Sequence, residues 1–297
     1  MNCYFHAPMP DNVPACPMAP GMKERTALKK ELERQSAASI VIPAIINGKE
    51  HFTDDRYRVT APHKHSLLLA ECCRCDGGML KDAVDAAMSA KETWEKLPRE
   101  HRFAIFEKAA QLIEGKYRYI ISASVMLGQG KTAWEAECDS PDELCDLMRY
   151  GIHFADQLYG MQPKCTPGVF NRVVYRPLEG FVCAVTPFNF ASINGNLPAA
   201  PAIMGNVVVW KPATTAVLSG YYIMKAFQEA GVPDGVINFV PCRGADVSQY
   251  VLRDSRLAGF HFTGSTTVFK DAWKLIGENI NSYRSYPRLV GETGGKD

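Results

Sequence analysis

The sequence predicts an α/β protein built on a twisted, parallel, five-stranded sheet. From Gly180 onward, short apolar segments alternate with stretches long enough to form crossover helices, such as 215–230 and 267–280. Ligands of such sheets bind at the carboxyl ends of the strands, so residues that follow each strand are the first candidates for a site. The expected strands are Phe181–Thr186, Val207–Lys211, Ile237–Pro241, Gly259–Thr263 and Arg288–Gly291.

The chain divides into three parts by composition and pattern. Residues 1–22 are rich in proline and methionine without a period, which predicts disorder. Residues 23–179 are expected to hold a charged surface helix over Lys23–Gln35, a strand-rich arm and a helical layer. Residues 180–297 form the expected Rossmann-type core.

The arm and the helical layer follow from two kinds of periodicity. Within Ile40–Glu71, apolar stretches are short, and Asn47-Gly48 between two of them is a strong hairpin signal. Apolar residues then recur at helical spacing over 80–94 and 103–113. We therefore expect strands first and then helices in this part of the chain.

Two further local patterns concern helix ends. The run Ser140–Glu143 offers an N-cap serine, a proline at the first helical position and a glutamate at the third, so we expect a helix from here to about Tyr159. The run Gly128–Thr132 is similar to the end of a phosphate-binding loop. Val125 stands where that loop needs glycine, and the preceding segment is helical. We therefore interpret this run as a helix C-cap and turn.

Composition excludes several classes of protein. Lys plus Arg is 33 against 32 for Asp plus Glu, so no excess of positive charge predicts a nucleic-acid partner. No run of about 18 apolar residues predicts a membrane span. The ten cysteines are scattered without a metal-binding or secreted spacing, so we expect no metal site.

The segments after the predicted strands carry a family resemblance. Their order and spacing resemble the aldehyde dehydrogenase superfamily over roughly residues 20–297, and the resemblance implies that family's fold with NAD as cofactor. Further cues at 126–132, 175–181 and 269–270 resemble most the delta-1-pyrroline-5-carboxylate dehydrogenase branch. That branch oxidises L-glutamate γ-semialdehyde to L-glutamate in proline breakdown. The post-strand segments are Thr186–Phe190, Trp210–Thr214, Phe262–Ser265 and Gly291–Lys296.

The resemblance assigns cofactor contacts that chemistry can support. Gly264-Ser265 closes a strand and opens a helix, whose N-terminal N–H groups can receive a pyrophosphate. The alternative is a plain strand-to-helix turn. Lys211 ends the neighbouring strand and can donate to ribose hydroxyls, the alternative being a solvated lysine. The residues expected to bind NAD are Thr186, Lys211, Gly264, Ser265, Thr266, Thr267 and Val268.

The resemblance also implies catalytic and substrate-binding residues. Asn189 matches the donor to the developing oxyanion, although a loop asparagine can instead bond to its own backbone. Glu292 matches the general base, the alternative being a salt-bridged carboxylate. Phe190 is expected to pack against the aldehyde chain, unless it is ordinary core. Glu143 is expected to complete the capping box of Ser140–Glu143, and the resemblance also implies a place near the substrate; the two roles are not exclusive.

The nucleophile that the resemblance implies is a cysteine some tens of residues after Glu292. The printed sequence ends at Asp297 without one, so we expect the catalytic domain to be absent and the chain to be inactive alone. Expected partners are a small aldehyde and either a homo-oligomer or full-length subunits. The alternatives are a non-catalytic module for NAD binding or for subunit interaction through the Ile40–Glu71 arm, and an incomplete gene product.

The expected location rests on the resemblance alone. The first twenty residues hold no Lys or Arg, which is unlike a mitochondrial leader. The family implies the mitochondrial matrix, and the cytoplasm is the alternative.

Overall fold

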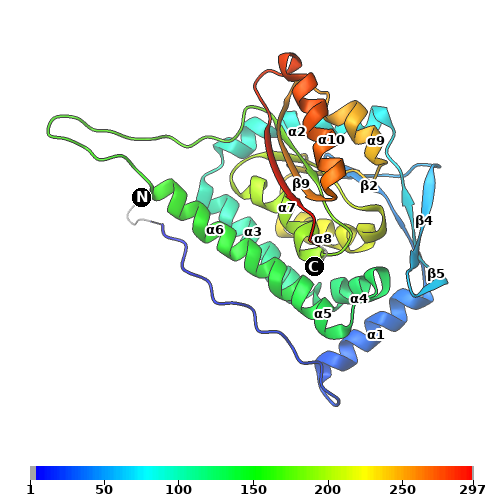
Figure 1. The fold of residues 1–297 in the computed structure, drawn as a ribbon. Coiled ribbons are helices and arrows are strands. Elements are labelled where there is room, and N and C mark those ends of the chain that lie inside the picture. Colours follow the sequence, from blue (N-terminus) through cyan, green and yellow to red (C-terminus); the bar gives the residue numbers. More distant parts are fainter. Residues whose placement is uncertain (1–4, 296–297) are drawn as a thin grey trace.

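A computed structural model describes residues 5–295, and residues 1–4 and 296–297, including Lys296 of the last motif, lie outside the described part. Figure 1 shows the order of its elements along the chain. The strands are β1 (Ile40–Ile42), β2 (Ala44–Ile46), β3 (Lys49–His51), β4 (Arg56–Ala61), β5 (Lys64–Cys73), β6 (Phe181–Val185), β7 (Val207–Lys211), β8 (Ile237–Phe239), β9 (Leu257–Gly264) and β10 (Arg288–Thr293). The helices are α1 (Lys23–Ala37), α2 (Gly77–Lys96), α3 (Arg99–Glu114), α4 (Arg118–Gln129), α5 (Ala133–Glu137), α6 (Leu144–Gly160), α7 (Ala191–Ile203), α8 (Val217–Ala230), α9 (Gly244–Asp246) and α10 (Thr266–Glu278), with π-helical turns η1 (Cys138–Glu143) and η3 (Val247–Val251) and 3-10 turns η2 (Thr214–Ala216) and η4 (Ile280–Ser282).

The main sheet has the strand order β10-β9-β6-β7-β8-β2-β3. Its first five strands in this order pair in parallel, and each overlaps one of the expected strands. Numbered by their sequence in the chain, these five strands lie in the order 5-4-1-2-3. The order in which successive strands are added therefore reverses between β6 and β9. The expectation of a five-stranded sheet was wrong in extent, because β2 of the arm pairs antiparallel with β8 and β3 pairs antiparallel with β2.

The arm is shared between two sheets. The predicted hairpin is confirmed: Asn47 and Gly48 have φ of 49° and 73°, as a type I′ turn requires between β2 and β3. The Asn47 N–H donates to Oδ1 of buried Asn238 on β8 at 2.9 Å, which ties the turn to the main sheet. The other strands form a second, three-stranded sheet in the order β1-β5-β4.

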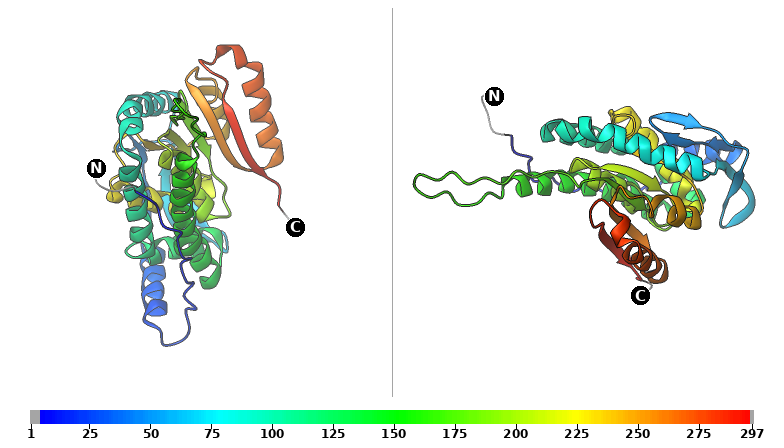
Figure 2. Two further views of the ribbon diagram at one scale, coloured as in Figure 1. Left: turned by 90° about the vertical axis from the view of Figure 1, so that its left-hand side faces the viewer. Right: turned by 90° about the horizontal axis from the view of Figure 1, so that it is seen from above.

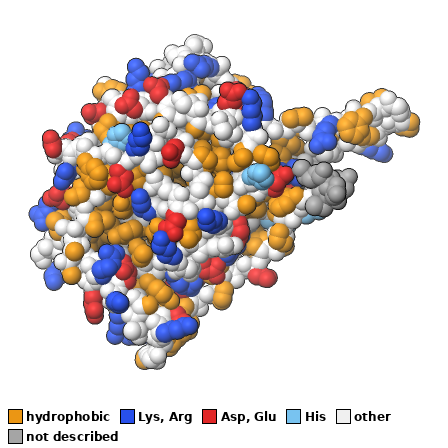
Figure 3. Space-filling model, turned by 180° about the vertical axis from the view of Figure 1, so that it is seen from behind, with side chains coloured by type: hydrophobic (Ala, Val, Ile, Leu, Met, Phe, Trp, Pro, Cys, Tyr) orange, Lys and Arg blue, Asp and Glu red, His pale blue; other side chains and the backbone are white. Residues whose placement is uncertain are grey.

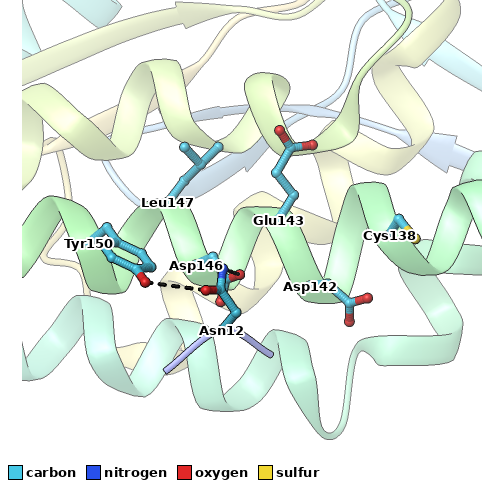
Figure 4. A pocket seen from close by; sticks show the side chains of 7 residues that line it. All are labelled: Asn12, Cys138, Asp142, Glu143, Asp146, Leu147 and Tyr150. Carbon is cyan, nitrogen blue, oxygen red and sulfur yellow. Dashed lines mark hydrogen bonds between the residues drawn. The ribbon is translucent and has the colours of Figure 1, made fainter. Parts of the chain in front are cut away.

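Residues 5–22 of the N-terminal segment predicted to be disordered are held against the rest of the protein. Residues 5–22 run beside α6 (Figure 1), and Ala7 and Val13 are buried there. The Ala7 N–H donates to Asp156 at 3.0 Å, and the Val13 N–H donates to Asp146 at 2.9 Å. Figure 4 shows the same contact region, a hollow of about 370 Å³ beside α6.

The helix expected to start at Ser140 begins earlier. Thr132 and Glu135 form the capping box at the start of α5, and the chain continues through the π-turn η1 into α6. Ser140 is buried inside that turn and its hydroxyl has no hydrogen-bond partner among the described residues. The expected end near Tyr159 is close to the observed end at Gly160. The C-cap expected in Gly128–Thr132 is confirmed, because Gly130 ends α4 with φ of 73°.

Helices on the sheet enclose the core. α2 contacts β6, β7 and β8, and α7 contacts β6, β7 and β9. Trp94 of α2 is buried and donates from Nε1 to the Ala202 carbonyl of α7 at 3.0 Å, which joins these two helices. Figure 2 shows β10 and α10 together at one side of the molecule, where the C-terminal end of the described chain lies.

The segment from Met161 to Glu179 projects from the body between α6 and β6 (Figures 1 and 2). Its two limbs are joined by one isolated β-bridge, Thr166 to Val169, and by side-chain hydrogen bonds such as that from the Val173 N–H to Oε1 of Gln162 at 2.9 Å. Phe170 and Val174 are 79% and 83% exposed, and Figure 3 shows hydrophobic side chains along this projection. The side chains of Phe170 and Val174 are therefore largely exposed and are not covered by the rest of the described chain.

Among the helices of residues 5–295, none combines the length and apolar character that crossing a bilayer requires.

Candidate active site

A cleft of about 610 Å³ lies at the carboxyl ends of β6, β9 and β10. It falls where the strand order reverses, the place at which doubly wound sheets bind their ligands. Three of the post-strand segments found in the sequence meet here. The cleft is lined by Pro187, Phe188, Asn189, Phe190, Ile193, Thr263, Gly264, Ser265, Thr266, Glu292, Gly294 and Gly295.

Asn189 and Phe190 form the turn between β6 and α7. Phe190 is the N-cap residue of α7, and its ring is 39% exposed in the cleft. The ammonium of Lys131 lies 4.2 Å from the centre of that ring, a cation–π contact from the end of α4. Phe190 is therefore a cleft residue and not ordinary core.

Glu292 stands near the end of β10, directly opposite Thr263 of β9. The Thr263 hydroxyl donates to Oε2 of Glu292 at 3.2 Å. Both residues line the cleft that Asn189 also lines. Asn189 and Glu292 thus border one space from the two sides of the point where the strand order reverses.

Glu143 does not cap a helix, so the capping interpretation was wrong. It ends η1, and its Oε2 accepts a hydrogen bond from the Ser192 hydroxyl of α7 at 2.9 Å. With Glu292 it lines a smaller cavity of about 330 Å³. Burial raises the pKa of Glu143, which favours its protonated form relative to an exposed glutamate.

A second cavity of about 600 Å³ lies beside the cleft, between the strand ends and α10. Lys211 of β7 lines it, and burial lowers the pKa of its ammonium. The walls are mostly apolar, so the lysine is one of few polar groups there. The lining is Val185, Lys211, Gly244, Ala245, Val247, Ser248, Leu252, Phe260, Phe262, Val268, Asp271, Ala272 and Leu275.

The start of α10 separates the two cavities. Ser265 is its N-cap, and its hydroxyl accepts from the Val268 N–H at 3.3 Å. Gly264, Ser265 and Thr266 line the cleft, and Val268 lines the second cavity. Thr267 lies in the same helical turn and lines neither of these two spaces.

Thr186 differs from the expectation in the use of its side chain. Its hydroxyl donates to Asn194 at 2.5 Å and accepts from Trp210 Nε1 at 3.1 Å, so it faces the core. Its N–H donates to the Lys211 carbonyl at 3.2 Å. Thr186 is 3% exposed and lines neither cavity, and its backbone carbonyl takes no part in these three contacts.

Sequence reasoning missed several residues around these cavities. Gly244 and Ser248 follow β8, so the rule of examining strand ends could have found them. Ser192 and Asp139 had no local signal, because their roles come from contacts between η1 and α7.

Neither a metal centre nor a thiol nucleophile emerges within residues 5–295. No group of three or more His, Cys, Asp or Glu side chains there is placed to hold a metal ion. None of the cysteines described lines the cleft or the second cavity. Burial raises the pKa of the Cys242 thiol to about 12, which keeps it protonated and poorly nucleophilic.

The chain belongs to the aldehyde dehydrogenase family, whose sequence model, described as "Aldehyde dehydrogenase family", matches residues 50–297. Among curated relatives, delta-1-pyrroline-5-carboxylate dehydrogenase of Agaricus bisporus is 48% identical over 99% of this chain and 54% of its own length. The mitochondrial human protein of that name is 41% identical over 96% of this chain and 51% of its own. The chain thus spans about half the length of the curated relatives it matches.

Solved structures show the same likeness. The delta-pyrroline-5-carboxylate dehydrogenase of Mycobacterium tuberculosis bound with NAD superposes with a TM-score of 0.98 at 47% identity, covering 100% of this chain and 56% of the other. A 1-pyrroline-5-carboxylate dehydrogenase from Thermus with bound NAD gives a TM-score of 0.89 at 28% identity, over 100% of this chain and 57% of the other.

Proposed function

We propose that residues 1–297 form the NAD-binding part of a dehydrogenase that oxidises L-glutamate γ-semialdehyde, from 1-pyrroline-5-carboxylate, to L-glutamate. The observation that carries the proposal is the pair of cavities that meet at the start of α10, with Lys211 in one and Asn189 and Glu292 in the other. The names of the relatives and the NAD bound in two similar structures support the substrate and the cofactor.

The residues present fit a dinucleotide. The first turn of α10 offers N–H groups and the positive end of its dipole to a pyrophosphate, and Gly264 brings no side chain into that approach. A Cβ added at Gly264 would lie 2.7 Å from the Phe262 ring, so the position suits glycine. Lys211 would donate to ribose hydroxyls, and the Thr186 carbonyl would border the cofactor. When bound, NAD supplies the hydride acceptor.

The cleft residues take the remaining roles. The Asn189 amide would donate to the aldehyde oxygen as negative charge develops on it. Glu292 would accept a proton from the water that releases the acyl group, with its carboxylate held by the Thr263 hydroxyl. Phe190 would pack against the aldehyde chain, and Glu143 would border the substrate from the smaller cavity.

Titration with NAD tests the cofactor site. We expect a saturable change in tryptophan fluorescence, and Lys211→Ala to weaken the affinity by about tenfold, as the loss of a charge-assisted hydrogen bond predicts. The matched control is Lys225→Ala, which removes a surface lysine of α8 that pairs with Glu50. A wild-type chain without a saturable response, or a Lys211→Ala chain with unchanged affinity, would contradict the proposal.

Turnover is a separate prediction. We expect a polypeptide of residues 1–297 to bind NAD without reducing it when the semialdehyde is added, because no cysteine described lines the cleft. The measurement is NADH absorbance against a mixture without protein. Reduction above that control would show that this chain supplies its own nucleophile.

The second candidate is a non-catalytic module that binds NAD or pairs with longer subunits. The exposed apolar side chains of 161–179 favour it, because such surfaces mark interaction sites. NAD binding with association but no turnover would fit this candidate. For location we propose the mitochondrial matrix, since several relatives are named mitochondrial, with the cytoplasm as the alternative.

A further inference from the structure

Helix α7 begins without a cap of its own. Its N-cap residue is Phe190, whose side chain cannot accept a hydrogen bond. The first N–H groups of a helix have no partner within it and need acceptors elsewhere. Here the Ala191 and Ser192 N–H groups each donate to Asp139, to Oδ2 and Oδ1 respectively, both at 2.9 Å.

Asp139 reaches α7 from the π-turn η1. The turn directs Asp139 and Glu143 to α7, while Asp142 faces Arg118; Figure 4 shows Glu143 and Asp142 on opposite sides of the helix. π-turns inside helices are frequent at functional sites. This one places two carboxylates against the helix that follows Asn189.

The buried charge of Asp139 is compensated from three directions. Asp139 is 3% exposed, and its Oδ2 also accepts from the Lys131 ammonium at 2.8 Å. The two N–H donors and the positive end of α7 complete its environment. A buried carboxylate with these partners fixes the groups around it, because releasing Lys131 leaves a charge unpaired and releasing either N–H leaves a helix donor unsatisfied.

The ion pair of Asp139 and Lys131 also contacts the Asn189–Phe190 turn through Lys131. Lys131, bound to Asp139, lies over the Phe190 ring at 4.2 Å. Phe190 is thus held through its ring by Lys131, and Ala191 and Ser192 are held through their N–H groups by Asp139. Asn189 has little freedom to leave the cleft while these contacts persist.

We propose that Asp139, together with Lys131, is a positioning residue that fixes the Asn189–Phe190 turn at the cleft. Only the use of Asn189 as donor to an aldehyde oxygen rests on the proposed function. The positioning itself follows from the contacts of Asp139 with α7.

The test is amide hydrogen exchange and NMR on Asp139→Asn in the chain of residues 1–297. An asparagine at position 139 has one acceptor oxygen in place of two. Its NH₂ group would face one of the two N–H groups, and two donors cannot form a hydrogen bond. We expect exchange at Ala191 and Ser192 to rise by at least about tenfold, the size of a lost charge-assisted hydrogen bond. The side-chain amide resonances of Asn189 should shift as well.

Asp142→Asn is the matched control. It changes a buried aspartate of the same turn whose partner is Arg118 and not α7. We expect it not to raise exchange at either amide and to leave the Asn189 resonances unchanged. Equal effects from the two variants, or no effect of Asp139→Asn, would overturn the proposal.

A wild-type measurement covers the case in which Asp139→Asn does not fold. Scalar coupling across the hydrogen bonds should link the Asp139 carboxylate carbon to the amide nitrogens of Ala191 and Ser192, and its absence would overturn the proposal. NAD titration of Asp139→Asn separates the two hypotheses, because Asp139 lines neither cavity. A wild-type chain that fails to bind NAD would defeat the proposed function and leave the positioning result standing.

Discussion

Gly180→Ala is expected to destabilise the fold by about 3 kcal/mol or more, the upper range for overpacking. A Cβ at Gly180 would lie 1.8 Å from the Arg256 carbonyl oxygen and 2.9 Å from its carbon. That carbonyl accepts from the Phe181 N–H at 3.1 Å, at the start of central strand β6. The Arg256 side chain is bonded to Asp254 and Asp85, so the clashing backbone is restrained on both sides.

The measurement is urea unfolding followed by circular dichroism, with midpoint and slope compared between variants. The control is Gly277→Ala near the end of α10, where an added Cβ would meet no atom within 4 Å. We expect that change to be neutral or to stabilise by up to about 1 kcal/mol, since alanine favours helix more than glycine does. Similar midpoints for the two variants would contradict the prediction.

Asp142→Asn is expected to stabilise the protein above neutral pH. Asp142 is buried, its Oδ2 has no hydrogen-bond partner among the described residues, and Oδ1 lies 3.3 Å from Arg118. Arg118 also pairs with fully buried Glu137, so two carboxylates share one guanidinium. Burial first, and then the charge of Glu137, raise the pKa of Asp142 from 3.8 to about 7.

The sign of the pH dependence follows from linkage. The folded state holds the Asp142 proton more tightly than the unfolded state, so the ionised side chain reduces stability as pH rises from about 4 through about 7. The reduction is complete above that range. Asparagine carries no charge, and we expect a gain of about 1–3 kcal/mol near pH 8 that fades near pH 4.

Unfolding by urea at several pH values checks this, with exposed Asp54→Asn as the control. A gain that does not change with pH would mean that charge at Asp142 is not the cause. A loss of stability near pH 8 would mean that its ion pair with Arg118 outweighs the burial.

Local pattern predicted the strands and the hairpin well because local chemistry decides them. Val207–Lys211 is an apolar run closed by Pro212, and the structure gives β7 the same bounds. Asn47-Gly48 produces a turn with positive φ at both positions, which few other residue pairs adopt easily. The two extra strands escaped prediction because joining a sheet edge is a tertiary event.

Other errors came from patterns that tertiary contacts override. Thr132 to Glu135 and Ser140 to Glu143 both have the spacing of a capping box, and only the first lies at a helix start. Residues 5–22 lack any periodic signal, and they are held by carboxylates more than 130 positions away in the sequence.

Examining the ends of the predicted strands identified the candidate site residues but not the residues that hold them in place. Asn189, Lys211 and Glu292 each follow or end a strand, and the structure brings the first and the last to one cleft. Asp139 lies in a helix far from any strand, so only the packing of η1 on α7 reveals its contact. The orientation of the Thr186 hydroxyl depends likewise on Trp210 and Asn194.

The two sides of the cleft differ in how firmly they are held. Asn189 precedes a helix whose first turn is bound to a buried carboxylate. Glu292 stands on β10, which pairs only with β9 among the described strands and exposes half of its residues. Edge strands open more readily than central ones. The Asn189 amide is therefore the more firmly held of the two groups, and any opening of β10 changes the distance of the Glu292 carboxylate from it.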